Sequence, residues 1–165
     1  MQRWTARIAL ALSLSLMAAQ PAQAQFWQCA PFARMVSGIS LFGNAGTWWA
    51  KAAGKFARGV APKTGAVMSF MPTAKMRVGH VAMVSKVLGA REVLLTHANW
   101  SRRGAVETDV RAIDVSERGD WSKVRVWYAG AMGTGTYPVN GFIYSGKAGS
   151  DDTTVAATTS TTLSS

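Results

Sequence analysis

The chain has 165 residues, a formal net charge of +10 and one cysteine, Cys29. A single cysteine excludes an intramolecular disulfide framework. The basic residues are scattered and no motif interleaves them with aromatic side chains, so the charge predicts a solvated basic surface and not a nucleic-acid interface.

The N-terminal segment has the pattern of an export signal. Arg3 and Arg7 precede an apolar run over 8–19, and the small-residue sequence AQA ends at Ala24. This order predicts a secretory signal peptide over residues 1–24, removed near Ala24, and a secreted or periplasmic protein. The apolar run is too short to span a bilayer, so no stable membrane insertion is expected.

The C-terminal segment 146–165 consists mainly of Ser, Thr, Ala and Gly. Such a composition buries too little apolar surface to offset the entropy of ordering, so a disordered tail is predicted. Residues 25–145 remain as one folded domain, which is long enough for a single core.

Two helices are predicted at the start of this domain. The apolar residues after Cys29 follow the i, i+3, i+4, i+7 spacing of one helical face: Phe32, Met35, Val36 and Ile39. Pro31 suits the first turn, where the N–H it lacks would have no partner. A second helix is predicted over 47–53, with Gly54 as its stop.

The second half of the domain has short β-type runs separated by turn residues. They cover residues 66–70, 80–88, 92–97, 123–128 and 141–144. Helices followed by strands predict an α+β fold, in which the N-terminal helices pack on an antiparallel β-sheet.

The chain has two histidines, and both lie at strand ends. His80 opens the run over 80–88 and His97 closes the run over 92–97. If these strands are antiparallel neighbours, His80 faces His97 or Asn99 across the pair. The helix start that carries Cys29 could pack over the same end of the sheet.

Such a grouping matches the needs of nucleophilic catalysis. The thiolate is the reactive form of cysteine, and a thiol with a pKa of about 8.5 needs a helix N-terminus or an imidazolium to lower that value. An imidazole removes the thiol proton and a third group orients the ring. Cys29, His80 and Asn99 would fill these three roles.

From Trp27 to Tyr144, the chain resembles the CHAP domain, a cysteine- and histidine-dependent amidohydrolase/peptidase of the papain-like/NlpC-type superfamily. The matching blocks are QCAPFAR, SGISLFGNAGTWWAKAAG, RGVAPKTGAVMSF, GHVAMVSKV, LLTHANW, DWSKVRVW and NGFIY. The resemblance implies a papain-like α+β fold. It also implies hydrolysis of peptidoglycan amide bonds, either between muramic acid and L-alanine or within the stem peptide or cross-bridge.

The resemblance carries over to individual residues. Cys29 matches the nucleophile and His80 the general base. Asn99 matches the asparagine of an acidic-x-Asn-Trp block and is expected to be the main orienting group. His97 occupies the acidic position of that block, which is a departure from the pattern.

Further site residues are weaker hypotheses. By analogy with cysteine hydrolases, the Cys29 backbone N–H and a group of Gln28 would bind the oxyanion. Trp48 and Trp100 are candidate substrate-binding residues, although a tryptophan on a short helix such as Trp48 also suits packing.

Two alternatives remain open. Cys29, His80 and His97 could ligate zinc, although no pair of them has a short chelating spacing. The chain could also be a non-catalytic cell-wall-binding domain of the same fold. For the enzyme, we expect a monomer that acts on peptidoglycan without a metal or another cofactor.

Overall fold

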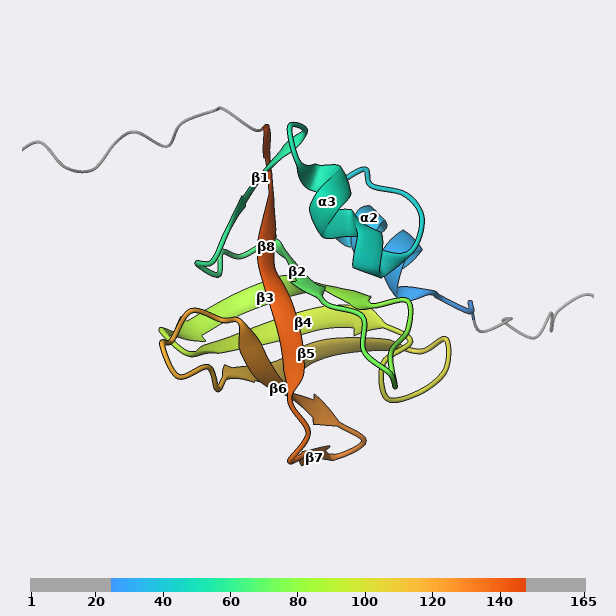
Figure 1. Ribbon diagram of the computed structural model, residues 1–165. Coiled ribbons are helices and arrows are strands. Elements are labelled where there is room, and N and C mark those ends of the chain that lie inside the picture. Colours follow the sequence, from blue (N-terminus) through green and yellow to red (C-terminus); the bar gives the residue numbers. More distant parts are fainter. Residues whose placement is uncertain (1–24, 148–165) are drawn as a thin grey trace, which may run out of the picture.

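The computed structural model describes residues 25–147, which form a mostly β structure (Figure 1). The helical elements are α2 (Cys29–Ser37), the 3-10 helix η1 (Ala45–Thr47) and α3 (Trp48–Ala52). The strands are β1 (Phe56–Gly59), β2 (Val67–Phe70), β3 (His80–Gly89), β4 (Glu92–Ala98), β5 (Val106–Asp114), β6 (Lys123–Tyr128), β7 (Ala131–Met132) and β8 (Tyr137–Lys147).

All the strands pair antiparallel in the order β1-β8-β2-β3-β4-β5-β6-β7. The long strand β8 also pairs with β6, where Val124 lies opposite Tyr137. This extra pairing closes six strands, β8-β2-β3-β4-β5-β6, into a barrel. Strand β8 crosses the sheet in Figure 1 because its first part pairs with β6 and its last part with β1.

The predicted α+β, papain-like fold, with N-terminal helices packed on an antiparallel β-sheet, is therefore wrong. The structure is 43% strand and 14% helix, and the two α-helices are short. The physical reason is the closure of the barrel. Since the curved sheet encloses most of the apolar side chains itself, the helices cover only part of its outer face.

The core accordingly has two parts. The larger cluster lies inside the barrel and includes Met68, Ala82 and Phe142. The smaller one lies between the helices and the outer face of β2, β3 and β8, where Val67, Val81 and Ile143 contribute. Where the helices cover β2, β3 and β8, neighbouring residues point to opposite faces that are both covered, which explains why these parts of the strands are apolar without alternation.

Helix α2 begins at Cys29, as predicted, and ends at Ser37 before Gly38, whose φ of 72° gives a left-handed C-cap. Its buried residues are Ala30, Phe32 and Ala33. Met35 was predicted on the buried face but is 56% exposed. Small alanines let α2 lie close to the barrel, so the contact face is rotated from the one that large side chains indicated.

The ends of the chain are only partly covered by the structure. Strand β8 continues to Lys147, two residues beyond the predicted domain boundary at 145. The predicted signal peptide over 1–24, and the tail from 148 onward, lie outside the described residues. Within the described part, no helix is long and apolar enough to cross a membrane.

Gly79 shapes the entry of the chain into β3, directly before His80. Its φ is 69°, and a methyl group there would lie 2.7 Å from backbone atoms of Gly46. The Gly46 N–H donates a hydrogen bond to the Val78 carbonyl over 2.7 Å, so the two backbone segments lie in direct contact. Only glycine fits this approach.

We expect Gly79→Ala to lower the free energy of unfolding by about 2 kcal/mol or more, because it combines an unfavourable φ with a backbone clash. Urea unfolding measures this change. Gly54→Ala is the matched control: its φ is 72° but nothing lies within 4 Å of an added methyl group, so it should cost only about 1 kcal/mol. Equal losses in the two variants would show that the Gly46 contact is unimportant.

Candidate active site

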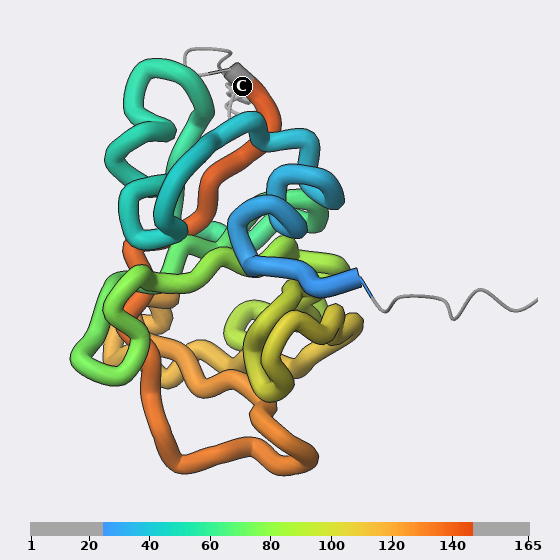
Figure 2. Tube along the Cα trace, turned by 90° about the vertical axis from the view of Figure 1, so that its right-hand side faces the viewer, coloured from blue at the N-terminus to red at the C-terminus, as the bar shows by residue number. Residues whose placement is uncertain are grey.

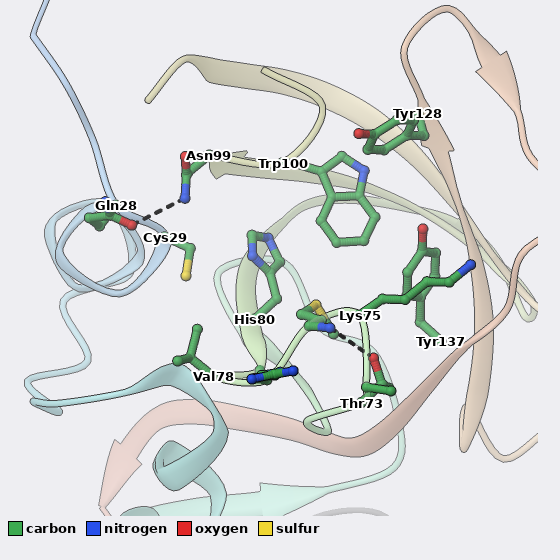
Figure 3. A pocket seen from close by; sticks show the side chains of 14 residues that line it. Gln28, Cys29, Thr73, Lys75, Val78, His80, Asn99, Trp100, Tyr128 and Tyr137 are labelled. Carbon is green, nitrogen blue, oxygen red and sulfur yellow. Dashed lines mark hydrogen bonds between the residues drawn. The ribbon is translucent and has the colours of Figure 1, made fainter. Parts of the chain in front are cut away.

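A cavity of about 760 Å³ opens where α2 meets the ends of β3 and β4. Figure 3 shows Cys29 and His80 side by side in this cavity, with Asn99 and Trp100 along one side. The loop over 73–79 forms the opposite wall. The site therefore lies at the junction between the helices and the barrel.

Cys29 is the first residue of α2, after Gln28 in an extended conformation with φ −92° and ψ 152°. The N–H groups of a first helical turn have no partner within the helix, so they create a positive end. Burial raises the pKa of the Cys29 thiol, and backbone N–H groups of Val81, Ala30 and Cys29 itself oppose that rise. The thiol therefore needs a base to become a thiolate at neutral pH.

His80 begins β3 and is almost fully buried. Its Nε2 is hydrogen-bonded to Nδ1 of His97 over 3.0 Å. Nδ1 of His80 is thus the ring nitrogen left for the thiol. Burial, together with the neighbouring His97, places the pKa of His80 well below its usual value, so this ring is neutral at neutral pH.

His97 on β4 is 0% exposed, and the indole of Trp100 stacks on it with a centroid distance of 5.4 Å and an interplanar angle of 29°. Burial lowers the pKa of His97 to about 4, although Glu107 partly opposes this effect. His97 is therefore neutral at neutral pH. Its Nε2 has no hydrogen-bond partner among the described residues.

The hydrogen bond between the rings fixes which nitrogens carry protons. If His80 accepts the thiol proton at Nδ1, its Nε2 must carry a hydrogen and donate to His97. Nδ1 of His97 is then the acceptor, and the proton of this neutral ring sits on its Nε2. His80 can therefore accept the thiol proton only when the neutral His97 ring carries its proton on Nε2.

Asn99 does not contact His80 through a hydrogen bond in this arrangement. Its Nδ2 donates to Oε1 of Gln28 over 3.1 Å, and its Oδ1 accepts from the Gly104 N–H over 2.8 Å. The Trp27 N–H also donates to the Gly104 carbonyl, over 3.0 Å. Asn99 thus fastens the segment before the nucleophile to the β4–β5 loop, and Figure 2 shows the two segments side by side.

Asn99 was expected to orient the His80 ring, but His97 is the residue hydrogen-bonded to that ring. Sequence reasoning favoured Asn99, whereas the structure places His97 on the far nitrogen of the His80 ring. Both lie near the end of β4, and pattern alone does not show which side chain faces β3.

Of the two candidate tryptophans, only Trp100 lines the cavity. Trp48 is 0% exposed and packs between the helices and the barrel, so it is too deeply buried to contact a substrate. The cavity also includes residues that sequence analysis did not single out: Lys75, Arg77, Tyr128 and Tyr137. Lys75 and Arg77 lie in a loop without hydrophobic periodicity, and Tyr137 begins a stretch that was not predicted as a strand. The sequence pattern therefore did not indicate that these residues line the site.

Gln28 lies at the edge of the cavity with an exposed side chain. Since its Oε1 accepts from Asn99, its amide N–H₂ group remains available to donate.

Within residues 25–147, no group of three or more His, Cys, Asp or Glu side chains is placed to hold a metal ion.

The family model of the CHAP domain matches residues 20–99. The match includes Cys29, His80, His97 and Asn99, and it covers the first part of the stretch in which the resemblance was found. No curated protein matches the chain. The match over residues 20–99 agrees with the resemblance to the CHAP domain seen in the sequence, and domains of this family are typically peptidoglycan-hydrolysing amidases or peptidases.

Proposed function

We propose that the protein is an exported cysteine-dependent hydrolase that cleaves amide bonds of peptidoglycan. The observation that carries this proposal is the placement of His80. Its Nε2 is engaged by His97 over 3.0 Å, and its other nitrogen is left for Cys29 at the start of a helix. Cys29 and His80 line one cavity, and His97 lies buried behind His80, hydrogen-bonded to its far nitrogen.

The chemistry follows from this grouping. His80 accepts the thiol proton at Nδ1, and the Cys29 sulfur attacks the carbonyl carbon of the amide. His80 then gives the proton to the leaving amine, and a water molecule hydrolyses the thioester with His80 again as base. Burial disfavours both charges of the thiolate–imidazolium pair, so the pair forms only with help from nearby dipoles.

The oxyanion of the tetrahedral intermediate needs donors fixed in advance. The Cys29 backbone N–H belongs to the free first turn of α2. The Gln28 amide is held by Asn99, which orients its free N–H₂ group. We assign the oxyanion to these two donors, and Asn99 then acts by positioning Gln28.

The cavity suits a peptide that carries carboxylates. Trp100, Tyr128 and Tyr137 offer an aromatic wall, while the exposed side chains of Lys75 and Arg77 add positive charge on the opposite loop. Export through the predicted signal peptide would bring the enzyme to the cell wall. The scissile bond is either the muramoyl-L-alanine amide or a bond within the stem peptide or cross-bridge.

We expect Cys29→Ala to abolish hydrolysis of purified peptidoglycan and to leave the melting temperature nearly unchanged, because the sulfur contributes little packing at a half-buried site. Release of new amino groups measures activity, and mass spectrometry of the fragments identifies the bond. Hydrolysis at the wild-type rate by the variant would overturn the cysteine mechanism.

Inhibitors distinguish a cysteine-dependent hydrolase from the zinc alternative. A hydrolase that uses Cys29 should lose activity on alkylation with iodoacetamide and keep it in EDTA, because its nucleophile is a thiolate. Activity that disappears in EDTA and returns with zinc would support the zinc alternative instead.

The two residues at the end of β4 should have different effects. His97→Ala removes the hydrogen bond to the base and should lower kcat about 100-fold with a changed pH profile. Asn99→Ala loosens Gln28 and should lower kcat less, without moving the pH profile. His97→Asn, which keeps a hydrogen-bonding group near the ring, should recover part of the loss and serves as control for the cavity that alanine leaves. A larger loss in Asn99→Ala would make Asn99 the orienting group.

A further inference from the structure

Strand β5 places a carboxylate beside the buried imidazole pair. Glu107 lies directly opposite His97 in the β4–β5 register. Directly opposed residues of antiparallel strands project to the same face, with Cβ atoms about 4.5–5.5 Å apart. Glu107 is therefore the acidic side chain next to His97, although it follows it by ten positions in the printed sequence.

The carboxylate of Glu107 is held in place by Ser101. The Ser101 N–H donates to Oε1 over 2.8 Å, and the Ser101 hydroxyl donates to Oε2 over 2.7 Å. The carboxylate oxygens of Glu107 accept both bonds, and such hydrogen bonds are stronger when the carboxyl group is ionised. The negative charge is thus fixed relative to the end of β4.

The geometry of the His97 ring directs its free nitrogen away from β3. Nδ1 faces His80 on β3, and the two nitrogens of an imidazole point in diverging directions. On the other side of β4, Glu107 lies opposite His97 and acts on its ring electrostatically without a hydrogen bond to Nε2. A nearby negative charge favours a hydrogen on that nitrogen over a bare lone pair.

We propose that Glu107 is a positioning residue of the active site, whose carboxylate selects the Nε2-protonated tautomer of His97 and thereby stabilises the imidazolium that forms on His80. This inference rests on the proposed function, in which His80 is the base. The proton stays on His97 throughout, so Glu107 acts as a fixed charge and takes no proton itself.

The surrounding charges support this assignment. His80 on β3 and Glu107 on β5 are the titratable groups that act on His97, and Cys29 on α2 faces His80. Glu107 raises the pKa of His97, yet burial outweighs it and the pKa stays at about 4. The link is therefore between a carboxylate and a neutral ring, and not a salt bridge.

Glu107→Gln tests the proposal, because it removes the charge and keeps an oxygen for Ser101. Glu92→Gln is the matched control: Glu92 lies on β4, the strand of His97, but at its far end, where it pairs with Arg111. The chain has only two histidines, so ¹⁵N-histidine NMR reports both rings without ambiguity. Alkylation of Cys29 by iodoacetamide reports thiolate formation without any substrate.

In Glu107→Gln, we expect the His97 signals to shift towards the Nδ1-protonated tautomer, and alkylation at neutral pH to slow about three- to tenfold. We also expect kcat to fall with KM little changed and the alkaline limb of kcat to move to lower pH. Glu92→Gln should match the wild type in each measurement. Ser101→Ala, which removes one of the two hydrogen bonds that hold the carboxylate, should show the same changes to a smaller degree.

Wild-type tautomers and alkylation rates in both Glu107→Gln and Ser101→Ala would overturn the role of Glu107. A wild-type protein that does not hydrolyse peptidoglycan, or an active Cys29→Ala variant, would instead overturn the proposed function. The NMR and alkylation measurements need no turnover, so the two failures are distinguishable. If Glu107→Gln does not fold, Ser101→Ala decides the question.

Discussion

The pairing of β8 with β6 as well as with β2 is the constraint on which the rest of the structure depends. It closes the sheet, and closure fixes the curvature of β3 and β4 at the end where their histidines meet. The outer faces of β2, β3 and β8 remain for the helices. Cys29 reaches His80 because small side chains on α2 allow the helix to lie close to that face.

The site is a chain of polar groups in an apolar setting. Burial lowers the pKa of both imidazoles and keeps them neutral, so in the proposed mechanism His80 becomes charged when it takes the thiol proton. The sequence has His97 at a position where the resemblance to the CHAP domain predicted an acidic residue. Glu107 on the neighbouring strand β5 places a negative charge in the same region, beside His97 and not in contact with His80.

Local patterns predicted the parts of the fold that local interactions determine. They include the start of α2 at Cys29 and the adjacent strands that bring His80 and His97 together. The barrel was not predictable in this way, since it requires β8 to pair with the distant strand β2 as well as with β6. Strand β5 was not predicted because most of its residues are polar or charged and only alternate positions near its end are buried. The orientation of single side chains, which separates His97 from Asn99 and buries Trp48, depends on register and packing that periodicity does not contain.

Closure of the barrel also determines how the folded protein presents backbone groups to other chains. The two strands at the margins of the sheet are β1 and β7, with four and two residues. Unpaired strand edges are the usual starting points for edge-to-edge aggregation, and short edges offer few free N–H and C=O groups. The short margins of this sheet therefore disfavour association of folded chains through strand pairing, without any contribution from the active site.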